Sequence, residues 1–290
     1  GREGVLKIGM ARMIVGSRAQ DLAVAQARTV LAELGAEWPD TAFVQRSLPS
    51  DEAVLRALEQ GALNLGLLEL ARLPLSLPEN VVLAAVTKRL EPRSVLIARG
   101  QRGLAELPEG ARVGVATRRE ATFVRAARRD LNPVEGLERL EDGLAHLATD
   151  DLQALVVPAA LLVQLGRGRG GDALLEPELF PPAVGQGCLG VLVREDDSLA
   201  AELAYTVRHR PSFDRVSAER SFARALSGTD YALGALALVS SEGELTLFGA
   251  LAHEREALSI QGQTTGEASE AVALGSELAQ DMLEQLKQRA

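Results

Sequence analysis

Apolar and polar positions alternate along most of the chain in a pattern that switches between strand and helix periods. Arg12–Ser17 has the short apolar run of a strand, and the segment after Asp21 carries apolar residues at helical spacing until Gly35. Leu63–Leu70 is nearly all apolar, which is typical of a strand buried on both faces. The alternation then restarts with a strand over Arg112–Thr117. This order predicts α/β lobes built around largely parallel sheets.

The last part of the chain has a different pattern. Ser212–Ala225 predicts a helix, and Ala268–Arg289 predicts a second helix with leucines at near-helical spacing. Between them lie three short predicted strands, over Ala232–Ser240, Glu244–Ala250 and residues 257–263. Consecutive strands bounded by helices predict a small α+β domain with a three-stranded antiparallel sheet.

Charge and cysteine content exclude several classes of function. Lys+Arg total 31 and Asp+Glu total 40, so the net charge is −9. An acidic chain lacks the basic footprint of a nucleic-acid binder, and it is not attracted to anionic membranes. The one cysteine, Cys188, allows no internal disulfide, and the three histidines have no metal-ligand spacing, so no metal site is expected. Without an apparent signal or membrane-spanning segment, we expect a cytoplasmic protein, either a monomer or one with an unknown protein partner.

The most specific motif is P-A-V-G-Q-G over Pro182–Gly187. Its glycines suit a tight crossover between lobes, because they supply positive φ angles. They equally suit a close approach of backbone N–H groups to an anion. The sequence leaves both interpretations open, and they are compatible.

Several motifs together resemble the hydroxymethylbilane synthase family, also called porphobilinogen deaminase. Besides P-A-V-G-Q-G they are V-G-S-R-A-Q-D-L-A-V-A-Q at Val15–Gln26, the segment Val113–Leu131, D-D-S at Asp196–Ser198 and V-S-A-E-R-S-F at Val216–Phe222. They follow the family order along nearly the whole chain.

The resemblance implies a fold with two periplasmic-binding-protein-like α/β lobes and a small third domain. The expected boundaries are residues 1–98 and 188–214 for the first lobe, 99–187 for the second and 217–290 for the third domain. The family condenses four porphobilinogen molecules to hydroxymethylbilane with release of ammonia. It grows the product on a dipyrromethane cofactor that a cysteine of the third domain carries through a thioether. An aspartate assists the chemistry, and arginines hold the substrate carboxylates.

The chain departs from the family where the catalytic aspartate is expected. The family segment A-V-H-S-x-K-D-x-P matches Gly66–Pro74, and Pro74 anchors the register. The aspartate then falls on Arg72 and its neighbouring lysine on Ala71. A guanidinium stays protonated and cannot accept a proton. Glu69 is the alternative carboxylate if it faces the site.

The cofactor attachment point is also altered. The family loop G-G-C-Q-x-P-x-G matches Gly228–Gly234, and its cysteine falls on or next to Asp230. Neither Thr229 nor Asp230 carries a thiol, and Cys188 belongs to another segment. The sequence therefore predicts no attachment residue and no cofactor.

The resemblance leaves a set of candidate anion-binding residues. They are Arg18, Thr117, Arg118, Arg119, Gly185, Gln186 and Gly187. We expect them to line a cleft between the lobes and to bind a small carboxylate-bearing ligand. The predicted function is that of a porphobilinogen-deaminase-like protein of tetrapyrrole biosynthesis whose catalysis is impaired or lost. The alternative is a small-carboxylate-binding protein or a scaffold subunit that uses the same cleft, so whether the chain is an enzyme is left open.

Overall fold

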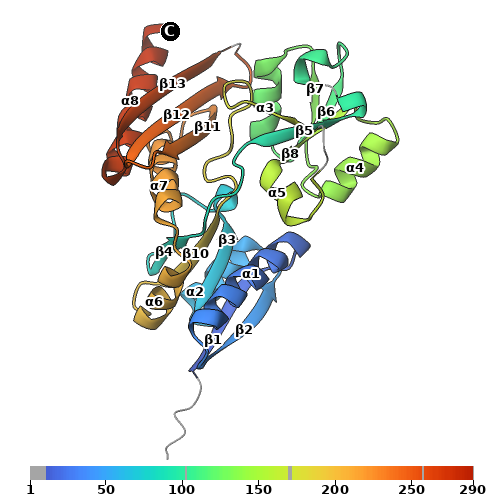
Figure 1. The fold of residues 1–290 in the computed structure, drawn as a ribbon. Coiled ribbons are helices and arrows are strands. Elements are labelled where there is room, and N and C mark those ends of the chain that lie inside the picture. Colours follow the sequence, from blue (N-terminus) through green and yellow to red (C-terminus); the bar gives the residue numbers. More distant parts are fainter. Residues whose placement is uncertain (1–10, 102, 169–171, 257, 290) are drawn as a thin grey trace, which may run out of the picture. The chain divides into compact units, whose positions relative to one another are not determined.

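The computed structural model describes residues 11–101, 103–168, 172–256 and 258–289, which divide into two compact units. The first unit runs to Thr87 and resumes over Leu189–His209. The second unit holds Lys88–Cys188 and the chain from Arg210 onward. Each unit is drawn in Figure 1 with its elements labelled.

The first unit is built on a five-stranded sheet in the order β2-β1-β3-β10-β4. Its elements are β1 (Ala11–Arg18), α1 (Asp21–Glu37), β2 (Thr41–Leu48), α2 (Asp51–Glu59), β3 (Leu65–Glu69), β4 (Val81–Val86), β10 (Leu189–Arg194) and α6 (Ser198–Thr206). Strand β1 is parallel to β2 and β3, whereas β10 is antiparallel to both of its neighbours. The sheet is therefore mixed rather than largely parallel.

Helices cover both faces of this sheet because successive residues of β3 point to opposite sides. Leu65 and Leu67 pack in one apolar core with residues of α1 and α6. Gly66 faces the other way, where a Cβ would come within 3.1 Å of Val54 on α2. This close approach explains why a glycine interrupts an otherwise branched apolar strand.

The second unit contains a five-stranded sheet in the order β7-β6-β8-β5-β9. Its elements are β5 (Ser94–Ala98), β6 (Arg112–Gly114), α3 (Arg118–Ala127), β7 (Asn132–Val134), α4 (Leu140–Ala148), β8 (Ala154–Pro158), α5 (Ala159–Gln164) and β9 (Ala173–Leu174). Strand β6 is parallel to β7 and β8, and β5 is antiparallel to β8 and β9. One face packs on α3 and the other on α4 and α5.

The same unit carries the predicted three-stranded antiparallel sheet, β11-β12-β13. Its elements are α7 (Arg210–Ala225), β11 (Tyr231–Val239), β12 (Glu244–His253), β13 (Ser259–Glu267) and α8 (Ala271–Arg289). Along β12, Leu245 and Leu247 pack in a core with α7 and α8, whereas Ala250 and Ala252 pack in the core of α3. A sheet buried on both faces joins the C-terminal region to the second lobe in one compact unit.

The predicted fold class is confirmed: two α/β sheets and a small α+β region with a three-stranded antiparallel sheet. The boundary of the first lobe differs from the expected residue 98. Strand β5 pairs with β8, so the chain leaves the first unit after Thr87. The apolar pattern of Ser94–Ala98 identifies a strand but does not specify which sheet it joins. Within the expected domains, residues 1–10, 102, 169–171, 257 and 290 lie outside the described part of the chain.

Candidate active site

In the first unit, charged side chains gather where the parallel strands β1 and β3 end. Arg18 is the last residue of β1, Glu69 is the last residue of β3, and Asp51 begins α2 after its cap, Ser50. Carboxyl ends of parallel strands meet at one edge of a sheet, which is the usual place for ligands in α/β folds. Arg72 follows β3 by three residues and joins the same cluster.

Asp51 is the common partner of both arginines in this cluster. Arg72 Nε donates a hydrogen bond of 2.8 Å to Asp51 Oδ2, and Arg18 Nε lies 3.9 Å from Asp51 Oδ1. The Asp51 and Arg18 side chains are almost covered, whereas the Arg72 side chain is 38% exposed. Arg72 is therefore held in place as the counter-ion of an acid that the sequence did not single out.

Glu69 is the buried carboxyl group that joins Asp51 in this cluster, and the exposed Glu52 also lies within reach of the Arg18 and Arg72 charges. The Oε1 atom of Glu69 is buried and has no hydrogen-bond partner. Burial raises the pKa of Glu69, and the opposing charges of Arg18 and Arg72 do not offset it. A raised pKa extends the pH range over which a carboxyl group keeps its proton, and a general acid must carry a proton to donate.

We expect Glu69→Gln to raise the free energy of unfolding at neutral pH. Because the folded-state pKa of Glu69 is raised, the stability from its neutral form is complete below the unfolded pKa of about 4.3 and is lost as pH rises through the folded pKa. The glutamine variant lacks this loss. Urea unfolding at pH 4 and pH 7 measures the difference. A variant less stable than the wild type at pH 7 would show that an ionised Glu69 is well paired.

In the second unit, the candidate residues lie at the start of α3, just after β6. Thr117 is the helix N-cap, and its Oγ1 accepts a 3.3 Å hydrogen bond from the Glu120 N–H. Glu120 Oε2 in turn accepts hydrogen bonds from the N–H groups of Ala116 and Thr117. This capping box satisfies donors at the helix start within the chain itself.

The two neighbouring arginines have different environments. Arg118 is exposed and pairs with Glu254. Arg119 points inward, with its guanidinium 5.4 Å from the centre of the Phe123 ring. Its Nη1 donates to Pro181 O at 2.9 Å and to Leu233 O at 3.4 Å, while its buried Nη2 has no hydrogen-bond partner. Burial lowers the pKa of Arg119, and no ion pair holds it among the described residues.

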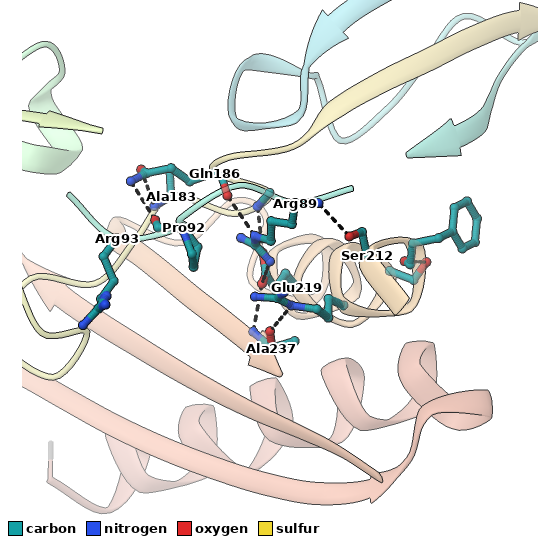
Figure 2. A network of polar contacts seen from close by, with 12 residues as sticks. Arg89, Pro92, Arg93, Ala183, Gln186, Ser212, Glu219 and Ala237 are labelled. Carbon is teal, nitrogen blue, oxygen red and sulfur yellow. Dashed lines mark hydrogen bonds and ion pairs between the residues drawn. The ribbon is translucent and has the colours of Figure 1, made fainter. Parts of the chain in front are cut away.

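The P-A-V-G-Q-G segment is held by a buried ion pair that the sequence did not predict (Figure 2). Arg89 Nη1 lies 2.5 Å from Glu219 Oε1, and both side chains are 0% exposed. Arg89 Nε also donates to Gln186 O, and Gly185 N–H donates to Glu219 Oε2 at 2.7 Å. Burial alone would lower the pKa of Arg89, but the charge of Glu219 outweighs it and the pKa is raised.

Gln186 completes this loop with internal hydrogen bonds. Its Nε2 donates to Pro92 O and Ser94 Oγ, and its Oε1 accepts from Ala183 N–H. Gly185 and Gly187 have φ angles of 75° and 87°, which other residues rarely adopt. The crossover interpretation of the motif therefore describes its contacts. The Gly185 N–H that was expected to face an anion is used by Glu219 instead.

Cys188 directly follows this loop and is 3% exposed. Burial raises the pKa of its thiol to about 12. The positive charge of Arg89 lowers this pKa and the negative charge of Glu219 raises it, so together they do not offset the effect of burial. The thiolate is the nucleophilic form of cysteine, so Cys188 is a poorly reactive thiol.

The structure brings together some of the predicted residues and not others. Arg18, Glu69 and Arg72 share one cluster in the first unit, and Ala71 is exposed beside Arg72. Thr117, Arg118 and Arg119 lie in the second unit, so their predicted convergence with Arg18 in a cleft stays a prediction. Asp230 is exposed at the end of its loop. Among the described residues, no group of three or more His, Cys, Asp or Glu could hold a metal ion, and no helix is long and apolar enough to cross a bilayer.

Sequence reasoning missed three functional or structural charges: Asp51, Arg89 and Glu219. A signal existed for Glu219, because it is the acid of the V-S-A-E-R-S-F motif on an otherwise mostly apolar helix face. Asp51 was visible only as a residue of a helix start. Nothing in the local pattern around Arg89 marked it as buried.

A family model and the sequences of curated relatives match this chain to the same family, porphobilinogen deaminase. A family model described as "Porphobilinogen deaminase, dipyromethane cofactor binding domain" matches residues 50–202. The chain is 36% identical to a porphobilinogen deaminase from Thermus thermophilus, over 94% of this chain and 96% of that protein. It is 33% identical to one from Deinococcus radiodurans, over 95% and 96% respectively. A solved structure of a putative methionine-binding lipoprotein from Bacillus subtilis is 13% identical, with a TM-score of 0.49 over 69% of this chain and 91% of that one, a likeness too loose to carry an argument.

The match corrects the expectation that no cofactor is used. That expectation is wrong, because the matched family domain binds a dipyrromethane cofactor, so a cofactor is expected here. The residues present fit such a group in one respect: Arg119 offers an enclosed, unpartnered guanidinium nitrogen to a carboxylate. They do not fit covalent attachment through sulfur, because the single thiol is that of buried Cys188.

Proposed function

This chain belongs to the porphobilinogen deaminase family, and from that premise we propose that it binds carboxylate-bearing pyrroles but condenses porphobilinogen with strongly impaired turnover. The observation that supports impaired turnover is the 2.8 Å hydrogen bond that Arg72 Nε donates to Asp51 Oδ2. The family resemblance assigns its catalytic carboxylate to position 72. At that position this chain has a cation, held by an acid of its own.

The charge at position 72 opposes the family reaction in two ways. A guanidinium stays protonated, so Arg72 cannot take up a proton from a reacting pyrrole. Its fixed positive charge also disfavours the positive charge that the family reaction develops on pyrrole nitrogen. Asp51 does not replace the missing carboxylate, because its charge is already shared between Arg72 and Arg18.

Retained catalysis through Glu69 is the second candidate function, and one observation favours it. Glu69 is a buried carboxyl group with an unpartnered oxygen and a raised pKa, three residues before Arg72. Such a group could donate or accept a proton if a substrate reached it.

Turnover of porphobilinogen by the purified protein tests the proposal, with the Thermus thermophilus relative as the active control. We expect a rate at least about 100-fold below the control, the lower range for loss of a general acid or base. Robust turnover that Glu69→Gln abolishes, while the exposed Glu59→Gln leaves it unchanged, would instead establish the Glu69 mechanism.

Binding separates the remaining possibilities. Calorimetric titration with porphobilinogen is expected to show binding without turnover. If porphobilinogen fails to bind whereas acetate or sulfate does, the chain is a small-anion-binding protein. If none binds, a scaffold role with a protein partner remains. We also propose that the protein is cytoplasmic and that it descends from an enzyme of porphyrin biosynthesis.

A further inference from the structure

The second unit contains a groove on the face of its five-stranded sheet that α4 and α5 cover. The volume of this groove is about 620 Å³, which is in the range of small-molecule sites. The candidate residues at the start of α3 belong to the helix on the opposite face of the same sheet. The groove is therefore separate from the site described above.

One wall of the groove is an apolar stripe of α4. Leu140, Leu144, Leu147 and Ala148 line the groove at helical spacing, so they share one side of the helix. The opposite wall includes Leu162 of α5. From its first to its last lining residue the stripe extends about 12 Å, at about 1.5 Å per residue. Such a wall suits an extended hydrocarbon chain.

Two arginines supply the charge among the described residues that line the groove. Arg99 lies at the C-terminal end of α4, where its Nη2 donates to Leu147 O at 2.9 Å and to Ala148 O at 2.8 Å. Arg167 contacts the first turn of α4, where its Nη1 donates a 2.7 Å hydrogen bond to Glu141 Oε1. Glu141 does not itself line the groove. The lining therefore combines apolar surface with positive charge, which complements an apolar anion.

The ion pair of Arg167 is the contact that a ligand can replace. The Arg167 side chain is 47% exposed and that of Glu141 is 57% exposed, and an ion pair in such a position contributes little to stability. Arg99 differs, because it holds the end of α4 and also pairs with Asp150. We propose that the groove binds an apolar monocarboxylate of the medium-chain fatty acid type, with its chain along the leucines of α4 and its carboxylate on Arg167. This site is additional to the one that the proposed function uses.

Calorimetric titration of the full chain with octanoate tests the proposal. We expect saturable binding of one octanoate per chain, at least about 100-fold tighter than that of acetate, because several CH2 groups leave water. Acetate has the same head group and lacks the chain. An octanoate affinity no higher than that of acetate overturns the proposal, and so does a titration that does not saturate.

Two tryptophan variants locate the site. Ala148→Trp places a large side chain in the groove and is expected to weaken octanoate binding by at least about ten-fold, because it displaces the ligand chain from the apolar wall. Ala145→Trp is the matched control, because Ala145 is also exposed on α4 but does not line the groove. Circular dichroism checks that both variants are folded. Equal octanoate affinities of the two variants would overturn the assignment of the groove.

Two charge variants identify the head-group contact. Arg167→Ala is expected to weaken octanoate binding by about three- to five-fold and to leave the binding of uncharged octanol unchanged. Glu141→Gln removes the acid that competes for Arg167 and is expected to strengthen octanoate binding by about two-fold. A general disturbance of the groove would weaken binding in both variants, so the opposite signs are specific to a carboxylate on Arg167. Weakening by Glu141→Gln, or no change with Arg167→Ala, would overturn this contact.

Discussion

Glu219→Gln is expected to lower the free energy of unfolding by about 3–5 kcal/mol, the usual cost of removing one partner of a buried ion pair. The substitution leaves the Arg89 guanidinium at 0% exposure without a counter-ion. The wild-type carboxylate accepts hydrogen bonds from the N–H groups of Gly185 and Ala237, at 2.7 and 2.8 Å, one on each oxygen. A glutamine side chain has a single oxygen and can replace only one of these acceptors. The loss extends to the crossover loop, because Arg89 also holds Gln186 O and, through its own N–H, Ser212 Oγ (Figure 2).

Urea unfolding followed by circular dichroism measures this effect. Glu141→Gln is the matched control, because Glu141 forms an ion pair with Arg167 in which both side chains are about half exposed. Its cost should stay below about 1 kcal/mol. The double change Arg89→Met with Glu219→Gln should recover part of the loss, since no charge is then buried alone. A Glu219→Gln variant as stable as the control would contradict the assignment of this pair as the main polar anchor.

Arg72→Asp is expected to leave porphobilinogen turnover at least about 100-fold below the active relative, although it restores a carboxylate at the family position. The contacts of Arg72 explain why the new carboxylate should not restore turnover. Asp51 would lose its 2.8 Å partner and keep only Arg18, 3.9 Å away. The new carboxylate would then stand near Asp51 and Glu69, and like charges at such a site oppose ionisation of all three.

The double change Arg72→Asp with Asp230→Cys is the smallest change that could restore activity. It adds a carboxylate at position 72 of the first unit and a thiol at position 230, in the loop that resembles the family attachment loop. We expect turnover to remain far below that of the active relative, because the new carboxylate at position 72 would still stand beside those of Asp51 and Glu69. Arg72→Asn serves as the control that removes the cation without adding an acid. Turnover restored by Arg72→Asp alone would show that this single charge caused the impairment.

The sequence by itself determined the family and the principal departures from it. Motifs such as P-A-V-G-Q-G and V-S-A-E-R-S-F are local strings, and the helix and strand periods are local as well, so both can be read without a structure. The absence of a thiol near Asp230 and the presence of Arg72 in place of an aspartate are also properties of aligned letters. The same reasoning was wrong about the cofactor, because a missing attachment residue does not remove a domain that binds the group.

Only the tertiary structure decided which distant residues meet. Arg72 and Asp51 are 21 positions apart, and Arg89 and Glu219 are 130 positions apart, so no local period links them. Arg119 points inward because its guanidinium donates to the carbonyl groups of Pro181 and Leu233, which are distant in the sequence. Its neighbour Arg118 is exposed. Likewise, β5 has an apolar pattern that suits either sheet, and its hydrogen bonds to β8 assign it to the second unit. Burial and charge pairing arise from contacts between segments, and those contacts are not encoded in the spacing along any one of them.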